Sequence, residues 1–161
     1  MIAVIADTHM PKGKRRLPDA CVERIREADA LVHAGDFSAA SVLEDLRGLC
    51  PVVHAVHGNV DDAVLRRELP ESLEIEVGGH RLAVVHDAGP KTGRLRRLRA
   101  RFPEADAVVF GHSHLPLHEE DEGFQIFNPG SPTERRRAPR ASMGLLRPTA
   151  SGLRFEHAWL G

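Results

Sequence analysis

Short apolar runs rich in β-branched residues alternate with helical patterns over the N-terminal part of the chain. Each run is apolar at nearly every position, which suits a strand buried on both faces. We predict strands at Ile2–Ala6, Ala30–His33, Val52–Val56, Arg81–His86 and Ala107–Phe110. Leu73–Val77 alternates strictly and precedes Gly78-Gly79, which predicts a hairpin with Arg81–His86.

Amphipathic helical patterns lie between these strands. Their apolar stripes are Cys21-Ile25-Ala28, Val42-Leu43-Leu46-Leu49 and Leu95-Leu98-Phe102. Pro18 and Asp19 predict the start of the first helix. Ser41 and Glu44 have the spacing of a capping box, which predicts the start of the second helix.

After Gly111 the pattern changes to short strands separated by turn residues. The predicted strands are Leu115–Glu119, Gln125–Asn128, Ala141–Leu146 and Leu153–His157, and Pro129–Arg140 is a predicted loop. No internal repeat or linker interrupts residues 1–161. We therefore predict one α/β domain, a four-layer α/β/β/α sandwich of two mixed β-sheets flanked by helices.

Composition narrows the class of protein. A net charge of −1 gives no overall bias toward nucleic acid or membrane. Aromatic residues make up only 4% of the chain, so a base-stacking surface is not expected. Basic residues gather at Lys12–Arg16, Arg94–Arg101 and Arg135–Arg140, and we interpret the first two segments as solvated rather than as phosphate or nucleic-acid sites.

The sequence predicts neither a targeting signal nor a cysteine spacing typical of a disulfide or metal site. The N-terminal run carries no preceding basic residues, and no apolar run is long enough to span a bilayer. Cys21 and Cys50 fit no metal or disulfide spacing, so both are interpreted as reduced core thiols. We expect a cytoplasmic protein without a membrane partner.

Potential metal ligands follow the predicted strands. They are Asp7, His9, Asp36, Asn59, His86, His112 and His114. The carboxyl ends of the strands in such a sheet form one rim, so these side chains should converge. A single strand-end His or Asp is ordinarily a hydrogen-bonding residue, but such a series is improbable by accident. Gly35, Gly58 and Gly111 precede three of the ligands, which predicts turns that pass close to an ion or phosphate.

Spacing and donor type indicate the kind of metal site. Asp7 and His9 are two apart, as are His112 and His114, so in extended chain each pair would point to one side. Carboxylate, amide and imidazole donors without thiolate suit Mn²⁺, Fe, Zn²⁺ or Ni²⁺ rather than a structural zinc site. The donors are too many for one tetrahedral ion and fit two ions about 3.5–4 Å apart that share one carboxylate.

This ordered series, D-x-H, G-D, G-N-x-D, H and G-H-x-H, resembles the calcineurin-like metallophosphoesterase superfamily, in particular its small prokaryotic phosphodiesterases. The resemblance covers essentially the whole chain and includes Asn128-Pro129-Gly130-Ser131, which also suits a turn with Pro and Gly at its centre. It implies a first ion held by Asp7, His9 and His114, a second held by Asn59, His86 and His112, and Asp36 as the bridge.

Two positions depart from the family pattern. Val60 stands where many members have a histidine that is thought to protonate the leaving group, and Ala88 replaces the second His of a His-Gly-His motif. Hydrolysis of esters with poor leaving groups would then need another acid. His57 is the candidate for that acid. Asp61 is predicted either to orient a metal ligand or to cap a helix over residues 62–69.

We therefore expect a dinuclear metal-dependent phosphodiesterase, with Asp36, Asn59, Asp61 and His57 as its catalytic candidates. A metal-bridged hydroxide would attack a small or nucleotide-type phosphate ester. Mn²⁺ is the expected metal, with Ni²⁺, Zn²⁺, Fe or Mg²⁺ as alternatives. The alternative functions are a phosphomonoesterase and a protein-interaction scaffold with a vestigial metal site. Nucleic acid is not a favoured partner, and the resemblance suggests a homo-oligomer.

Overall fold

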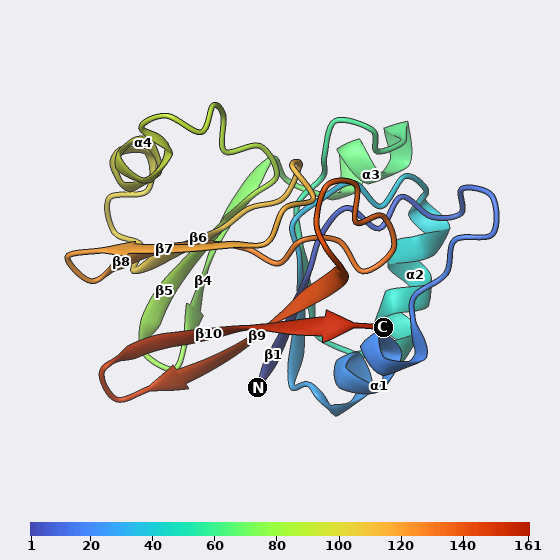
Figure 1. Ribbon diagram of the computed structural model, residues 1–161, viewed down its shortest axis with the longest axis horizontal. Helices are drawn as coiled ribbons and strands as arrows, with labels where there is room; N and C mark the ends of the chain where they lie inside the picture. Colours follow the sequence, from blue (N-terminus) through green and yellow to red (C-terminus); the bar gives the residue numbers. More distant parts are fainter.

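Two five-stranded β-sheets pack face to face in the computed structural model, which describes residues 1–161 (Figure 1). The first sheet has the order β10-β9-β1-β2-β3, formed by Gly152–Leu160, Ala141–Thr149, Ile2–Ile5, Ala30–His33 and Val53–Ala55. The second has the order β4-β5-β6-β8-β7, formed by Ser72–Val77, His80–Val85, Ala107–Val109, Phe124–Asn128 and Leu117–Asp121. Both sheets mix parallel and antiparallel pairs, as predicted.

Four helices complete the fold. They are α1 (Asp19–Glu27), α2 (Ala40–Leu49), α3 (Ala63–Glu68) and α4 (Arg94–Arg101). α1 and α2 cover the outer face of the first sheet, and α4 covers that of the second (Figure 1). No helix combines the length and apolar composition that a membrane crossing requires.

β1 shows why its run is apolar at every position. Ala3 and Ile5 pack in the core beneath α1 and α2, whereas Ile2 and Val4 belong to the core between the two sheets. A third core lies beneath α4. Each central strand thus buries both faces, and the layers follow the predicted α/β/β/α order. Cys21 and Cys50 are free and buried, as predicted.

α1 begins at Asp19 as predicted, whereas the start of α2 differs from the predicted one. Ser41 lies inside α2 and does not cap it, so the predicted capping box is wrong. The Asp62 carboxylate instead accepts hydrogen bonds from Ala40 N at 3.0 Å and from Leu65 N at 2.9 Å. One side chain therefore serves the first turns of both α2 and α3. β7 also begins at Leu117 rather than Leu115, because the segment before it belongs to the loop that carries His112 and His114.

Candidate metal centre

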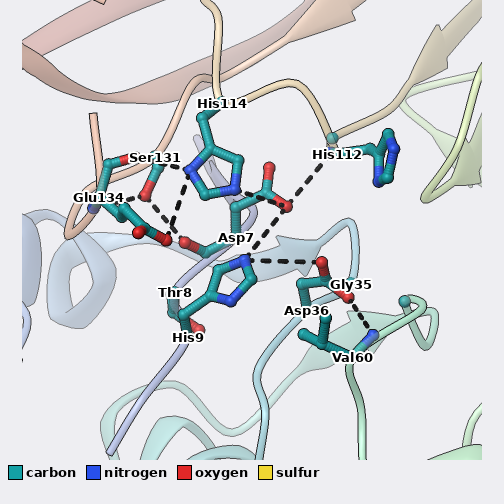
Figure 2. A network of polar contacts seen from close by, with 12 residues as sticks. Asp7, Thr8, His9, Gly35, Asp36, Val60, His112, His114, Ser131 and Glu134 are labelled. Atoms are coloured by element: carbon teal, nitrogen blue, oxygen red, sulfur yellow. Dashed lines mark hydrogen bonds and ion pairs between the residues drawn. The ribbon is translucent and has the colours of Figure 1, made fainter. Parts of the chain in front are cut away.

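The first donor group comprises Asp7, His9 and His114, which the loops after β1 and β6 bring together. His9 Nε2 and His114 Nε2 lie 3.9 Å and 3.7 Å from Asp7 Oδ1. Asp7 and His114 are completely buried, and Figure 2 shows the three side chains turned toward one another. Asp7 Oδ2, His9 Nε2 and His114 Nε2 are buried without any hydrogen-bond partner. Unsatisfied donors of this kind fit a cation between them.

The second donor group comprises Asp36, His86 and His112, with Asn59 beside them. Asn59 Oδ1 is 2.9 Å from His86 Nε2 and 3.1 Å from His112 Nδ1, and these two ring nitrogens are 3.3 Å apart. His112 and Asn59 are exposed, whereas His86 is buried. Donors about 3–3.5 Å apart match the spacing of atoms that share an ion at about 2.1 Å. The donor chemistry and the spacing therefore fit a second cation here.

Asp36 lies between the two groups. Its Oδ2 is 3.5 Å from His9 Nε2, a contact drawn in Figure 2. The same oxygen is 3.2 Å from His86 Nε2, so one carboxylate oxygen faces both groups. Its Oδ1 accepts a hydrogen bond from Val60 N at 3.0 Å, which holds the carboxylate in this orientation. The geometry is that of a carboxylate that could bridge two ions.

The pKa shifts follow from burial and from these contacts. Burial raises the pKa of Asp7 to about 8 and lowers the pKa of His114 to about 4. Burial acts to raise the pKa of Asp36, but the hydrogen bond and charge of His86 outweigh it and lower that pKa. A cation would favour an ionised Asp7 and neutral imidazoles, the forms that bind metal.

The backbone of the site is unusual. Asp7, His9, Asp36, His112 and His114 all have positive φ, between 45° and 71°. Left-handed conformations cost on the order of 1–3 kcal/mol each in residues other than glycine, and they gather where function requires them. The prediction of extended chain at these pairs was therefore wrong. His112 and His114 do not point to one side but belong to different donor groups, because the chain turns sharply between them.

Gly35 and Gly58 allow the ligand segments to pack closely. A Cβ on Gly58 would lie 2.0 Å from Asp36 Oδ1, and one on Gly35, whose φ is +93°, would lie 2.8 Å from His86 Nδ1. The close neighbours of these glycines are thus other ligand residues, rather than only the ion or phosphate that we predicted.

Asp61 connects the ends of β2 and β3. Its carboxylate accepts hydrogen bonds from Gly58 N at 2.7 Å, Asp36 N at 3.1 Å and Ser38 N at 2.9 Å. The alternative role as a helix cap is wrong, since Asp62 caps α3. Asp61 instead holds the backbone of Asp36, and its contribution to catalysis stays a prediction.

The loop Pro129–Arg140 supports the first donor group, a role that side-chain chemistry alone did not predict. Ser131 Oγ donates to Asp7 O at 2.8 Å, and Thr133 Oγ1 donates to Thr8 O at 2.7 Å. His114 Nδ1 lies 2.6 Å from Glu134 O, so Nδ1 carries the proton and Nε2 presents its lone pair to the centre. The signal was the predicted Asn128–Ser131 turn, in which Gly130 has a φ of 76°.

The basic segments are more structured than predicted. Arg15 forms an ion pair with Glu134 at 2.7 Å, which ties the Lys12–Arg16 segment to the loop beneath His114. On α4, Arg97 donates to the carbonyls of Ala88 and Pro90, both at 2.7 Å. These guanidinium groups hold loops around the centre.

His57 and Val60 flank the second donor group. His57 lines a pocket of about 310 Å³ together with Asn59 and His86, and its Nδ1 is buried without a partner. Val60 carries no proton donor, and its side chain is 44% exposed. The position of His57 beside the ligands supports a role as the acid, but that role stays a prediction.

A sheet rim that presents carboxylate, amide and imidazole donors is typical of metal-dependent phosphoesterases. The chain belongs to the calcineurin-like phosphoesterase superfamily, whose domain model matches residues 1–151. A probable metallophosphoesterase of Methanothermobacter thermautotrophicus is 35% identical over 138 residues, which are 84% of this chain and 79% of that protein. The predicted family is therefore confirmed, and with it a metal-dependent phosphoesterase.

Two further matches, at lower sequence identity, are not named as metallophosphoesterases. A phosphodiesterase of Methanocaldococcus jannaschii is 20% identical over 142 residues, covering 80% of this chain and 82% of that protein. The structure of wild-type Vps29 of Entamoeba histolytica in complex with zinc matches with a TM-score of 0.78 and 22% identity, over 98% of both chains. At this identity the likeness to Vps29 shows the shared fold.

Proposed function

We propose that this protein is a dinuclear phosphodiesterase, with Asp36 as the shared ligand. The position of Asp36 Oδ2, within 3.5 Å of His9 and 3.2 Å of His86, is the observation that carries the proposal. The unpaired donors of the first group and the converging donors of the second support it. Mn²⁺ is the ion we expect at both positions, because oxygen and imidazole donors without thiolate suit it.

The residues of the chain position the donors and leave room for a substrate. The carbonyls of Glu134 and Ala34 orient His114 and His86, so that each presents its Nε2. Two divalent cations, when bound, supply Lewis acidity that neutralises charge on the phosphoryl oxygens and makes water a better nucleophile near neutral pH. The exposed sides of His112 and Asn59 leave the second group open for the ester.

The leaving group faces the part of the site that departs from the family pattern. Val60 cannot donate a proton, so esters with acidic leaving groups, such as nitrophenyl esters, should be the better substrates. His57, in the pocket beside Asn59, is the side chain we propose to assist poorer leaving groups.

The test is hydrolysis of bis-p-nitrophenyl phosphate by metal-stripped protein to which Mn²⁺, Ni²⁺, Zn²⁺ or Mg²⁺ is returned. We expect metal-dependent turnover that Asp36→Asn reduces by about 10³-fold or more, since the shared ligand loses its charge. Asp45→Asn, an exposed carboxylate on α2, is the matched control and should leave turnover unchanged. Equal turnover by wild type and Asp36→Asn would refute the proposal.

The two alternatives give different results in the same assay. A phosphomonoesterase would prefer p-nitrophenyl phosphate to the diester. A scaffold would bind metal but hydrolyse neither ester. Metal binding alone does not separate a scaffold from an enzyme, because a vestigial site that keeps its donors would also bind metal. Turnover is therefore the measurement that decides.

A further inference from the structure

A pocket of about 430 Å³ lies between the loops of the metal centre and β10, and we call it the Trp159 pocket. Ser113 and Leu115 reach it from the segment that carries His112 and His114. Arg137 and Pro139 reach it from the loop that holds His114, and Trp159 from β10. The pocket is therefore built from the same segments as the site, but contains none of the proposed ligands.

One wall of the pocket is apolar and exposed. Leu115 is 40% exposed and Trp159 is 43% exposed, which is unusual for large apolar side chains so close to a polar centre. The Trp159 ring ends a row of stacked rings on the inner face of β10. Phe127 and His157 have centroids 4.4 Å apart, and His157 and Trp159 have centroids 6.2 Å apart. This row holds the indole from the core side. Arg140 lies over the same ring with its guanidinium carbon 6.0 Å from the centroid, and the part of Trp159 that is still exposed is what a ligand can contact.

The rim of the pocket is positively charged. Lys91, Arg94 and Arg137 line it, and no acidic residue does. The pocket near His57, in contrast, includes Glu71 and Asp87. The largest cavity, of about 480 Å³ at the opposite ends of β5 and β6, includes Asp106 and Glu120. Of these three spaces, only the Trp159 pocket combines an apolar wall with cations alone.

Arg94 places a guanidinium at the rim that is held in position but has unused hydrogen-bond donors. Its guanidinium lies 5.0 Å from the centroid of the Phe110 ring, just before Gly111 and His112 in the chain. Arg94 Nε is buried and has no hydrogen-bond partner, and its Nη2 makes only a long contact of 3.4 Å to Gly89 O. A guanidinium held over a ring with unused donors suits an oxyanion.

We propose that the Trp159 pocket binds the organic group of a nucleotide-type phosphodiester, with the nucleobase against the Leu115–Pro139–Trp159 wall and a non-scissile anionic group at Arg94 and Arg137. The assignment rests on the proposed function, since the scissile phosphate would lie at the metal centre. Charge complementarity and a flat apolar wall favour this occupant over a neutral or a cationic one.

The test uses the fluorescence of Trp159, which is the only Trp in a chain without Tyr. Metal-free protein is titrated with adenosine 5′-monophosphate, adenosine and inorganic phosphate, so the signal requires neither metal nor turnover. We expect a saturable change with the nucleotide, about tenfold weaker binding of adenosine because a charge-assisted contact is lost, and no change with phosphate alone.

Matched variants then distinguish binding in the Trp159 pocket from a general effect of positive charge on the surface. Arg94→Met keeps the aliphatic stem and should weaken nucleotide binding about tenfold, whereas Arg96→Met, exposed on the same helix and outside the pocket, should not change it. Leu115→Asp, at an exposed position, should weaken binding through its charge without a folding defect.

Several results would overturn the proposal. They are equal affinities for nucleotide and phosphate, equal effects of Arg94→Met and Arg96→Met, and a Trp159 signal that changes with protein concentration as dimers form. The last result would assign the wall to self-association. Lack of diester turnover with metal would contradict the proposed function but would leave this titration intact, so the two failures are distinguishable.

Discussion

The two donor groups of the metal centre are built differently. Asp7 and His114 of the first group are completely buried, and Asp7 Oδ2 and His114 Nε2 have no hydrogen-bond partner. In the second group, His112 and Asn59 are exposed, and the donors already contact one another. The loop of Ser131 and Glu134 closes over the first group, whereas a pocket opens beside the second.

This difference indicates that the two groups hold their ions with different affinities. The enclosed group has its donors held apart in advance, so an ion that enters them satisfies atoms that are otherwise unpaired. The open group must give up contacts among its own donors when an ion binds. We therefore expect a tightly held ion at the first group and a more readily exchanged ion at the second, where the substrate also enters.

The largest expected effect comes from removing one histidine of each group. His114→Asn and His112→Asn should each lower diester turnover by about 10³-fold, since both ions contribute to charge stabilisation. The metal content should differ, however. His112→Asn should keep one ion through dialysis against metal-free buffer, whereas His114→Asn should keep none. Equal metal loss in both variants would mean that the groups are not separable.

Removal of metal from the wild-type protein should lower its thermal stability, and most of that effect should come from the ion of the first group. Metal at a hundredfold excess over its dissociation constant adds about 2.7 kcal/mol, so a chelator should lower Tm by about 5–10 °C. His112→Asn should retain most of this shift, because the tight group is intact. Thermal unfolding with and without chelator measures it, and a Tm independent of metal would contradict the cation sites.

Ser131→Ala tests whether the loop makes the first group tight. Ser131 Oγ donates to Asp7 O and accepts from Glu134 N at 2.8 Å, so its loss should loosen both Asp7 and the carbonyl that orients His114. Affinity for the more tightly bound ion should fall about tenfold in calorimetric titration. Ser151→Ala, in the exposed β9–β10 turn, is the control; a similar loss there would exclude a specific role for the loop.

The smallest expected effect is a gain. Val60→His places an imidazole at an exposed position beside the second group, and should raise turnover of diesters with alkoxide leaving groups about tenfold. Nitrophenyl esters should be nearly unaffected, because their leaving group departs without a proton. Val64→His, at a 45% exposed position in the first turn of α3, should change neither rate. An equal gain in both variants would rule out position-specific proton donation.

The spacing of the residues indicated the donors, and only the family resemblance implied how they divide between two ions. Strand ends could be located because apolar runs stop before Asp7, Asp36 and His86. Parallel pairing aligns such ends only within each sheet, and β1 and β2 belong to the first sheet whereas β5 and β6 belong to the second, so the packing of the two sheets brings the donors together. That His112 and His114 divide between the groups depends on left-handed turns, which no periodicity reveals. The capping box at Ser41 failed for a related reason: Asp62, distant along the chain, supplies the cap.

By itself the sequence determined the alternation of strands and helices, the chemistry of the donors and the family, because each depends on residue types at short spacings. Only the tertiary structure decided that Ser131 and Glu134 support Asp7 and His114, and that Asp61 holds the backbone of Asp36. It also placed Trp159, near the end of the chain, beside the segment of Leu115. Such contacts join residues far apart in the chain, and their energies depend on burial and on orientations that arise only when the two sheets pack.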